Sequence, residues 1–354
     1  MVQQNKSKYL AMKDLLLTKI LNGDYPNQSF IPTERQLSET YQVSRITMRA
    51  ALALMEKEGL ITRVQGRGTR VTFKQGATQN NIDMIAIVSN AYGPFNGELM
   101  SGVNQLAEKS NSLVLFRERI SDENIFSDNG TVHQLIKKNI KNIIVWTQRI
   151  PVPPKHLELV RGMGVNLVFF DTVQNSPFAD DIALDNFSAV KTLINVLNQS
   201  NPTIINPNYA FFGCKNTTMS SSIEREQAFD QQKGGNKYLI NINKNYWQKE
   251  IYASLQIIQK NICHGIISAN GYLAIEIKKQ IIKNFPLLQA LKVVTIDNEE
   301  PSFMDSQGID RIEQPYFDFG KKSFELIKRQ NELGPLWQPG KYLLQGKLVL
   351  SGKM

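Results

Sequence analysis

Cysteine and histidine are scarce in this sequence. Its 354 residues include two cysteines, Cys214 and Cys263, and three histidines, His133, His156 and His264. These residues are scattered along the chain and match no ligand spacing, which argues against a disulfide framework and against a structural zinc site. We therefore expect neither a bound metal ion nor a stabilising cross-link.

Long apolar runs are missing as well. No stretch approaches the roughly 18 apolar residues that a membrane-spanning helix needs. The first residues, MVQQNKSKYLAMK, lack the apolar core of a secretion signal. The sequence also contains no glycine-rich phosphate loop and no nucleophile elbow, two common marks of an enzyme site. We expect a cytoplasmic, non-enzymatic protein that has no membrane partner and needs no cofactor.

What the sequence does have is an uneven distribution of positive charge. The first 74 residues carry 12 Lys or Arg against 6 Asp or Glu, a net of +6, while the other 280 carry 29 against 26, a net of +3. Most of the excess therefore lies in a small part of the chain. Such asymmetry favours a polyanionic partner for the N-terminal part.

The N-terminal part predicts three helices followed by a hairpin. Apolar residues recur at helical spacing from Tyr9 to Leu21, Thr33 and Gln36 form a capping-box pattern, and Ser44 precedes a further helix that Gly59 ends. The residues that we expect on the buried face of that helix are Ile46, Ala50, Ala51, Leu54 and Met55. The segment LITRVQGRGTRV then predicts a short two-stranded hairpin.

Beyond this unit the pattern of apolar and polar residues changes. Residues 74–82 are polar and predict a linker between an N-terminal domain, residues 1–73, and a larger domain, residues 83–354. In the larger part, apolar runs alternate with amphipathic helical segments, and the runs that predict strands are MIAIVS, SLVLF, NIIVW, NLVFFD, YAFFG, HGIISA and KVVTID. This alternation predicts an α/β fold with parallel sheets covered by helices on both faces, and the number of units favours two sheets in two lobes.

The three helices and the hairpin are typical of a winged helix-turn-helix, in which the second helix of the motif enters the major groove of DNA. The glycines of QGRG permit a tight hairpin tip whose backbone can approach the minor groove as a wing. The residues that we expect to contact DNA are Arg35, Arg45, Thr47, Arg49, Gln65, Gly66 and Arg67. For any single arginine, the alternative is an ordinary solvated helix face.

The run IPTERQLSETYQVSRITMRAALALMEKEGLITRVQGRGTRV resembles the winged-helix domain of the GntR family of bacterial regulators. Thr33 stands where many members have serine, and Arg70 where an aromatic residue is common. The resemblance implies double-stranded operator DNA as a partner. Because one winged helix buries little surface, we expect a homodimer on a near-palindromic site, joined through the larger domain.

Polar side chains gather at the ends of the predicted strands of the larger domain, where open α/β sheets bind ligands. Asp, Asn and Arg side chains there suit a polyhydroxylated ligand, and aromatic side chains could stack on a sugar face. The residues that we expect to bind the effector are Tyr92, Phe95, Trp146, Asp171, Arg225, Asn270, Asp297 and Gln314. The alternatives are that the two aspartates cap helices, that Asn270 is a turn residue and that Trp146 belongs to the core.

The order of segments from Asp83 to Val349 resembles the effector domain of LacI/GalR-type repressors, which are related to periplasmic sugar-binding proteins. Joined to a GntR-type head, such a domain is similar to arabinose-responsive repressors. The resemblance implies a sequence-specific repressor of carbohydrate-utilisation genes that a small sugar releases from its operator. L-arabinose or another monosaccharide is the first choice of effector.

Two other functions stay open at this point. A GntR-type head can precede an aminotransferase-like enzyme, which needs a Schiff-base lysine and a phosphate cup. A GntR-type head can also precede a domain that binds a non-sugar metabolite, such as a small chorismate-lyase-like domain. About 270 residues of alternating strands and helices are too many for that small domain. A cofactor absorbance in the purified protein would favour the enzyme.

Overall fold

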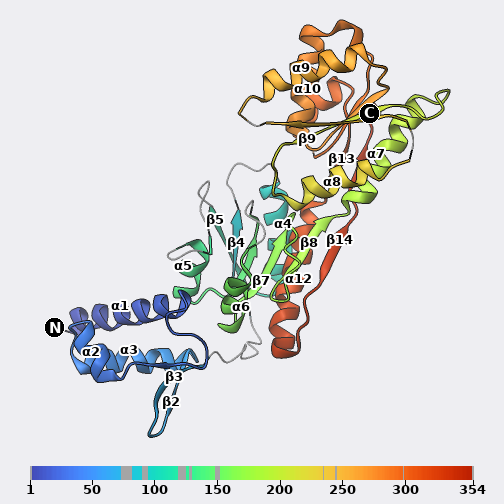
Figure 1. Cartoon of the computed structure of the whole chain (residues 1–354). Coiled ribbons are helices and arrows are strands. Elements are labelled where there is room, and N and C mark those ends of the chain that lie inside the picture. The colour runs from blue at the N-terminus through green and yellow to red at the C-terminus, as the bar shows by residue number, and fades with distance from the viewer. Residues whose placement is uncertain are drawn as a thin grey trace.

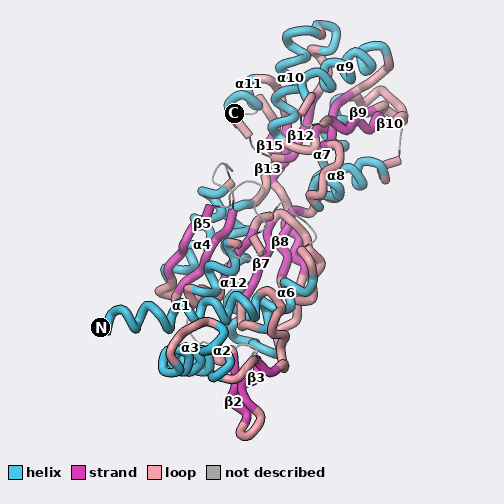
Figure 2. The backbone as a smooth tube through the Cα atoms, turned by 60° about the vertical axis from the view of Figure 1, so that its left-hand side comes forward, coloured by secondary structure: helices cyan, strands magenta, loops and turns pink. Residues whose placement is uncertain are grey.

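A computed structural model describes residues 2–72, 82–89, 95–118, 125–126, 130–147, 152–233, 235–243, 245–297 and 299–352, without the side chains of residues 2–7. Three bodies follow one another in an elongated molecule: an N-terminal head, a first α/β lobe (the N-lobe) and a second α/β lobe (the C-lobe) (Figure 1). The two ends of the chain lie at opposite ends of the molecule (Figure 2). The predicted combination of a winged helix with a two-lobed α/β domain is confirmed.

The head consists of three helices and a three-stranded antiparallel sheet of order β1-β3-β2. Its elements are α1 (Val2–Leu21), β1 (Phe30–Ile31), α2 (Glu34–Thr40), α3 (Arg45–Lys57), β2 (Ile61–Val64) and β3 (Gly68–Val71). The predicted capping box is confirmed, because Thr33 and Gln36 each accept a hydrogen bond from the backbone of the other. Ser44 Oγ accepts a hydrogen bond from the N–H of Thr47 at 3.1 Å. These caps satisfy amide groups that the start of a helix leaves open.

The buried face of α3 differs from the predicted one. The buried side chains of α3 are Thr47, Met48, Ala51, Leu52 and Met55. Ile46, which was expected in the core, is 78% exposed, and Thr47, which was expected to face DNA, is 8% exposed. The reason is that apolar residues cover more than one face of α3, so periodicity alone does not choose between them. Packing against α1 and α2 makes the choice.

The N-lobe is built on a six-stranded parallel sheet of order β14-β8-β7-β6-β4-β5. Its strands are β4 (Met84–Ser89), β5 (Leu113–Glu118), β6 (Asn142–Val145), β7 (Asn166–Phe170), β8 (Asp180–Leu184) and β14 (Lys341–Leu344). Its helices are α4 (Asn96–Lys109), α5 (Thr131–Lys137), α6 (Pro154–Gly162), α12 (Tyr316–Leu333) and the 3-10 helix η2 (Gly334–Leu336). α4 and α12 pack on one face of the sheet, and α5 and α6 on the other.

The C-lobe repeats this architecture with the strand order β10-β9-β11-β12-β13-β15, in which only β15 is antiparallel to its neighbour. Its strands are β9 (Tyr209–Cys214), β10 (Lys237–Ile242), β11 (Gly265–Ser268), β12 (Val293–Ile296), β13 (Asp310–Glu313) and β15 (Lys347–Val349). Its helices are α7 (Asn186–Ser200), α8 (Ser220–Asp230), α9 (Trp247–Lys260), α10 (Gly271–Asn284), η1 (Pro286–Leu288) and α11 (Pro301–Ser306). α7 and α8 cover one face, and α9 and α10 cover the other.

The chain passes between the lobes at three places: at Asp185 after β8, at Gln314 after β13, and at Gln345 after β14. Two of these crossings are bonded to each other. The N–H of Asp185 donates to the carbonyl of Leu344 at 2.9 Å, and Gln345 Nε2 donates to Asp185 Oδ2 at 3.0 Å. Three short connections of this kind can act as a hinge between two lobes.

Candidate functional site

The exposed N-terminal half of α3 forms a basic surface on the head. Arg45 and Arg49 are both exposed there. The guanidinium of Arg49 donates to both carboxylate oxygens of Glu34, at 2.9 and 3.1 Å. On α2, Arg35 Nε pairs with Glu39 at 2.9 Å. Ion pairs between exposed side chains contribute little to stability, so Arg35 and Arg49 can exchange their carboxylate partners for an anionic ligand.

The hairpin of β2 and β3 projects away from the body of the head as a wing (Figures 1 and 2). Its tip, Gln65, Gly66 and Arg67, is exposed, and the N–H of Arg67 closes the turn on the carbonyl of Val64 at 3.0 Å. Gly66 has a φ of +69°, a left-handed conformation that favours glycine. Six of the seven residues expected to contact DNA are therefore exposed on the head. Thr47 is the exception, because its hydroxyl lies 2.8 Å from Ser44 Oγ inside the cap of α3.

A cavity of about 130 Å³ lies between the two lobes, next to the hinge. The structure brings together here every described residue that was expected to bind an effector: Phe95, Trp146, Asp171, Arg225, Asn270, Asp297 and Gln314. Tyr92 lies outside the described residues. The remaining lining residues, which sequence reasoning did not find, are Met219, Ser221, Ser222, Glu299 and Tyr316. The sequence could have identified Ser221 and Ser222 as lining residues, because they stand at the start of the helix that carries Arg225.

Both lobes and the hinge contribute to this cavity. Trp146 and Asp171 follow strands of the N-lobe, Asn270 and Asp297 follow strands of the C-lobe, and Gln314 is itself a crossing residue. This placement is the carboxyl-end position at which open α/β sheets bind ligands. A molecule held in the cavity would therefore touch both lobes at once.

The two aspartates are held in an unusual backbone conformation. Asp171 has a φ of +56° and Asp297 a φ of +98°, a region that non-glycine residues seldom adopt. The backbone N–H of Asp171 donates to Ile182, and that of Asp297 donates to Ile312, so the adjacent strands fix both conformations. Such a conformation costs on the order of 1–3 kcal/mol and is typical of functional sites.

Arg225 reaches the cavity from α8 and is almost completely buried, with 3% of its surface exposed. Its Nε donates to Asn186 Oδ1 at 2.8 Å, and its Nη1 donates to the carbonyl of Ala269 at 2.6 Å. Nη1 also lies 3.8 Å from Asp297 Oδ2. These contacts fix the plane of the guanidinium.

Three buried polar atoms around the cavity have no hydrogen-bond partner among the described residues. They are Asp171 Oδ1, Arg225 Nη2 and Gln314 Oε1. Buried polar groups are nearly always paired, and an unpaired group costs about 1–3 kcal/mol. Two acceptors and one donor therefore lie at one cavity, where a polar ligand can pair with all three.

The electrostatics of the cavity are dominated by carboxylates. Burial raises the pKa of Asp171 to about 7, although the positive charge of Arg225 opposes this shift. Burial also raises the pKa of Asp297, against the opposing effects of Arg225 and of a hydrogen bond from Gln314 Nε2. Glu299, which is less buried, has a raised pKa for the same reason. One guanidinium thus faces three carboxyl groups.

Aromatic rings form the wall of the cavity on the N-lobe side. Phe95 stacks on Tyr316 with ring centres 5.0 Å apart, and its centre lies 5.9 Å from that of Trp146. Trp146 Nε1 donates to Asp171 Oδ2 at 3.4 Å. The alternative that Trp146 belongs to the core holds at the same time, because the side chain is 4% exposed and packs in the main core.

The alternative interpretation of Asn270 also holds without removing it from the cavity. Asn270 caps α10, since its Oδ1 accepts a hydrogen bond from the N–H of Leu273 at 2.9 Å. The backbone N–H of Gly271, at the start of the same helix, acts against the rise in the pKa of Asp297. Both side chains therefore lie at the start of α10 and line the cavity.

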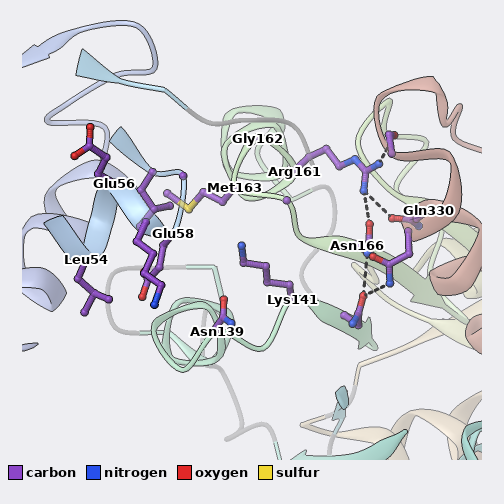
Figure 3. Close-up of a pocket in the computed structure, with 17 residues that line it drawn as sticks. Leu54, Glu56, Glu58, Asn139, Lys141, Arg161, Gly162, Met163, Asn166 and Gln330 are labelled. Carbon is purple, nitrogen blue, oxygen red and sulfur yellow. Dashed lines mark hydrogen bonds between the residues drawn. The ribbon is translucent and has the colours of Figure 1, made fainter. Parts of the chain in front are cut away.

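A larger cavity of about 610 Å³ lies between the C-terminal end of α3 and the N-lobe. Figure 3 shows Glu56 and Glu58 of the head on one side and Arg161, Asn166 and Gln330 on the other. Three of the polar side chains of the lobe, Arg161, Asn166 and Gln330, are already bonded to one another there. Arg161 Nη1 donates to Asn166 Oδ1 at 2.7 Å and to Gln330 Oε1 at 3.2 Å. We therefore regard the cavity between the lobes as the candidate ligand site.

No helix among the described residues is both long and apolar enough to span a membrane. The same part of the chain contains no group of three or more His, Cys, Asp or Glu side chains placed to hold a metal ion.

The head matches a family of known proteins. The family described as "Bacterial regulatory proteins, gntR family" matches residues 8–71. The arabinose metabolism transcriptional repressor of Geobacillus stearothermophilus is 36% identical over 89 residues, which are 25% of this chain and 24% of that protein. The chain thus aligns with about a quarter of the length of this relative.

The fold of the two lobes has counterparts among solved structures. A LacI transcriptional regulator from Lactobacillus brevis matches with a TM-score of 0.63 at 16% identity, over 75% of this chain and all of the other. A solute-binding protein from Burkholderia graminis, solved with D-arabinose, matches with a TM-score of 0.61 at 12% identity, over 76% and 96% of the two chains. Residues 8–71 thus form a winged-helix domain that matches the gntR family of bacterial regulators, and it is joined to an α/β domain with the two-lobed fold seen in LacI-type regulators and solute-binding proteins.

Proposed function

We propose that this protein is a sugar-responsive transcriptional repressor. The head binds operator DNA, a monosaccharide binds between the lobes, and the sugar releases the DNA. The observation that carries the proposal is the set of three unpaired buried atoms, Asp171 Oδ1, Arg225 Nη2 and Gln314 Oε1, around one cavity behind a DNA-binding type of domain. Hydroxyl groups both donate and accept hydrogen bonds, so a sugar can satisfy both kinds of atom.

The size and charge of the cavity favour a small neutral sugar. A volume of about 130 Å³ is well below the ~300–1,000 Å³ of pockets for drug-sized ligands. A sugar phosphate would bring negative charge towards Asp171, Asp297 and Glu299, with only Arg225 to offset it. L-arabinose is the first choice, because the Geobacillus relative is named for arabinose metabolism and the Burkholderia neighbour was solved with D-arabinose.

The hinge supplies a route from sugar to DNA. A sugar that bonds to Asp171 of the N-lobe, to Arg225 of the C-lobe and to Gln314 at the crossing favours one relative orientation of the lobes. If two copies pair through both lobes, closure moves the two heads relative to each other and away from the spacing of the operator half-sites. Binding of the sugar then weakens binding of the operator, and binding of the operator weakens binding of the sugar by the same amount. The coupling free energy is about 1–3 kcal/mol.

Calorimetric titration of the full chain tests the ligand. We compare L-arabinose, D-arabinose, D-ribose, D-glucose and D-galactose with ribose 5-phosphate and glucose 6-phosphate. We expect one neutral monosaccharide to bind, and the phosphates not to bind. Preferred binding of a phosphorylated or non-sugar metabolite would reject the assignment of a neutral sugar and support the alternative of another metabolite.

A further inference from the structure

Ile46 is an isolated large apolar side chain on the DNA-facing surface that we propose for the head. It is the second residue of α3 and is 78% exposed in the complete chain, so neither the head nor the N-lobe covers it. The opposite side of the helix provides the core of the head, with Met48, Leu52 and Met55 at most 2% exposed. Ile46 thus faces away from every apolar surface of the described structure.

The neighbours of Ile46 define what this face of the helix can meet. Arg45 precedes it, and Arg49 lies three residues further on, on the same side of the helix. Both arginines are exposed and suit phosphates or guanine edges. An isoleucine between them offers no hydrogen bond, so it can recognise only an apolar group. In the major groove, the C5-methyl group of thymine is the apolar group at the base edges.

We propose that Ile46 determines specificity by packing against the C5-methyl group of a thymine in each operator half-site. The proposal rests on the proposed DNA-binding function and adds the chemical feature that is read. Isoleucine suits this role because a β-branched side chain keeps essentially one χ1 rotamer in a helix, so little conformational freedom is lost on contact. Ser44 and Thr47 fix the helix start beneath it through the cap hydrogen bond at 3.1 Å.

Replacement of thymine by uracil tests the proposal, because it removes the methyl group and leaves base pairing unchanged. The wild-type protein first selects a tight-binding duplex from a pool with a randomised central region. Each thymine of that duplex is then replaced singly by deoxyuridine, and dissociation constants are measured at fixed salt. We expect one position per half-site at which wild-type affinity falls roughly fourfold, the equivalent of one buried methyl group.

Three variants make the result specific to Ile46. Ile46→Ala should bind the thymine duplex more weakly than wild type and should not distinguish uracil from thymine at the critical position. Ile46→Val, which keeps a branched apolar side chain, should still distinguish them. Leu10→Ala truncates an exposed apolar side chain on α1, which is 40% exposed, and should behave as wild type.

Two results would overturn the proposal. One is a selected duplex in which no single uracil replacement weakens wild-type binding. The other is an equal loss for wild type and Ile46→Ala at every thymine. Failure to select any duplex above the random pool would overturn the proposed DNA-binding function together with this inference, and is therefore distinguishable from both.

Discussion

The buried carboxyl group of Asp171 predicts that Asp171→Asn stabilises the empty protein while it weakens sugar binding. The pKa of Asp171 is raised from 3.8 to about 7, mainly by burial. This rise disfavours the charged form of Asp171 in the folded state by at most about 4 kcal/mol. The folded state binds more protons than the unfolded chain between these two values. The free energy of unfolding should therefore fall as pH rises from about 4 to about 7, and should level off above pH 7.

Chemical denaturation of the sugar-free protein at several pH values measures this effect. We expect the free energy of unfolding of Asp171→Asn to exceed that of wild type by about 1–4 kcal/mol at pH 8 and to equal it near pH 4. Asp185→Asn is the control of opposite sign, since burial raises the pKa of Asp185 but hydrogen bonds, which include those from Ser188 and Gln345, together outweigh burial and lower the pKa overall. That variant should lose stability relative to wild type above pH 4. Equal stability of Asp171→Asn and wild type at pH 8 would refute the reasoning.

Sugar affinity should change in the opposite direction from stability. If sugar hydroxyls donate to Asp171 Oδ1, the ionised carboxylate is the binding form. Wild-type affinity should then rise from pH 6 to pH 8, and Asp171→Asn should bind weakly with no such rise. Weak binding in a more stable protein would show that the site is maintained at a cost in stability.

Two further substitutions have equally definite outcomes. Arg49→Ala should lower the affinity for a selected operator duplex by about 1–3 kcal/mol, while the affinity for random DNA changes much less, as measured by fluorescence anisotropy. Glu34→Gln removes the partner of Arg49 and should not weaken DNA binding. Equal losses of affinity on both DNAs for Arg49→Ala would make Arg49 a phosphate contact. Gly320→Ala should destabilise the protein by about 1–3 kcal/mol in thermal unfolding, because a Cβ at Gly320 would lie 2.1 Å from the carbonyl oxygen of Leu99 where α12 crosses α4. Gly97→Ala on α4, where a Cβ meets nothing within 4 Å, is its control, and equal effects of the two would contradict the close-packing argument.

The head was predictable because its signals are local. The capping box of Thr33 and Gln36, the cap at Ser44 and the glycines of the wing each lie within a few residues of the partner that they need. The buried face of α3 was not predictable, since apolar residues occur on more than one of its faces and the choice depends on α1 and α2. The burial of Thr47 was not predictable for the same reason.

The strands of the two lobes were predictable where they are apolar. Five strands, β8, β10, β13, β14 and β15, were not predicted, because they are short or carry polar residues. In β8, Asp180 is completely buried, and it is tolerated because Gln330, Trp337 and the N–H of Gly340 donate to it from more than 140 positions away. No local pattern contains partners at that distance.

The effector residues were predictable as a group but not as a network. Their position after apolar strands identified Asp171, Asp297 and Asn270. The left-handed backbone of the two aspartates, the bond from Arg225 to Asn186 and the unpaired atoms emerge only when both lobes are assembled. The assignment of these residues to sugar binding stays a prediction.

Operator affinity with and without sugar tests the central proposal most directly. It is measured on a selected duplex for wild type and for Arg225→Ala, after thermal unfolding has shown that the variant is folded. The sugar found by calorimetry should weaken wild-type binding about 5- to 150-fold. Arg225→Ala should keep the sugar-free operator affinity and lose the response, because its truncation leaves sugar hydroxyls without a partner in a buried site. An unchanged wild-type affinity in saturating sugar, or release of the variant at the wild-type sugar concentration, would contradict the account.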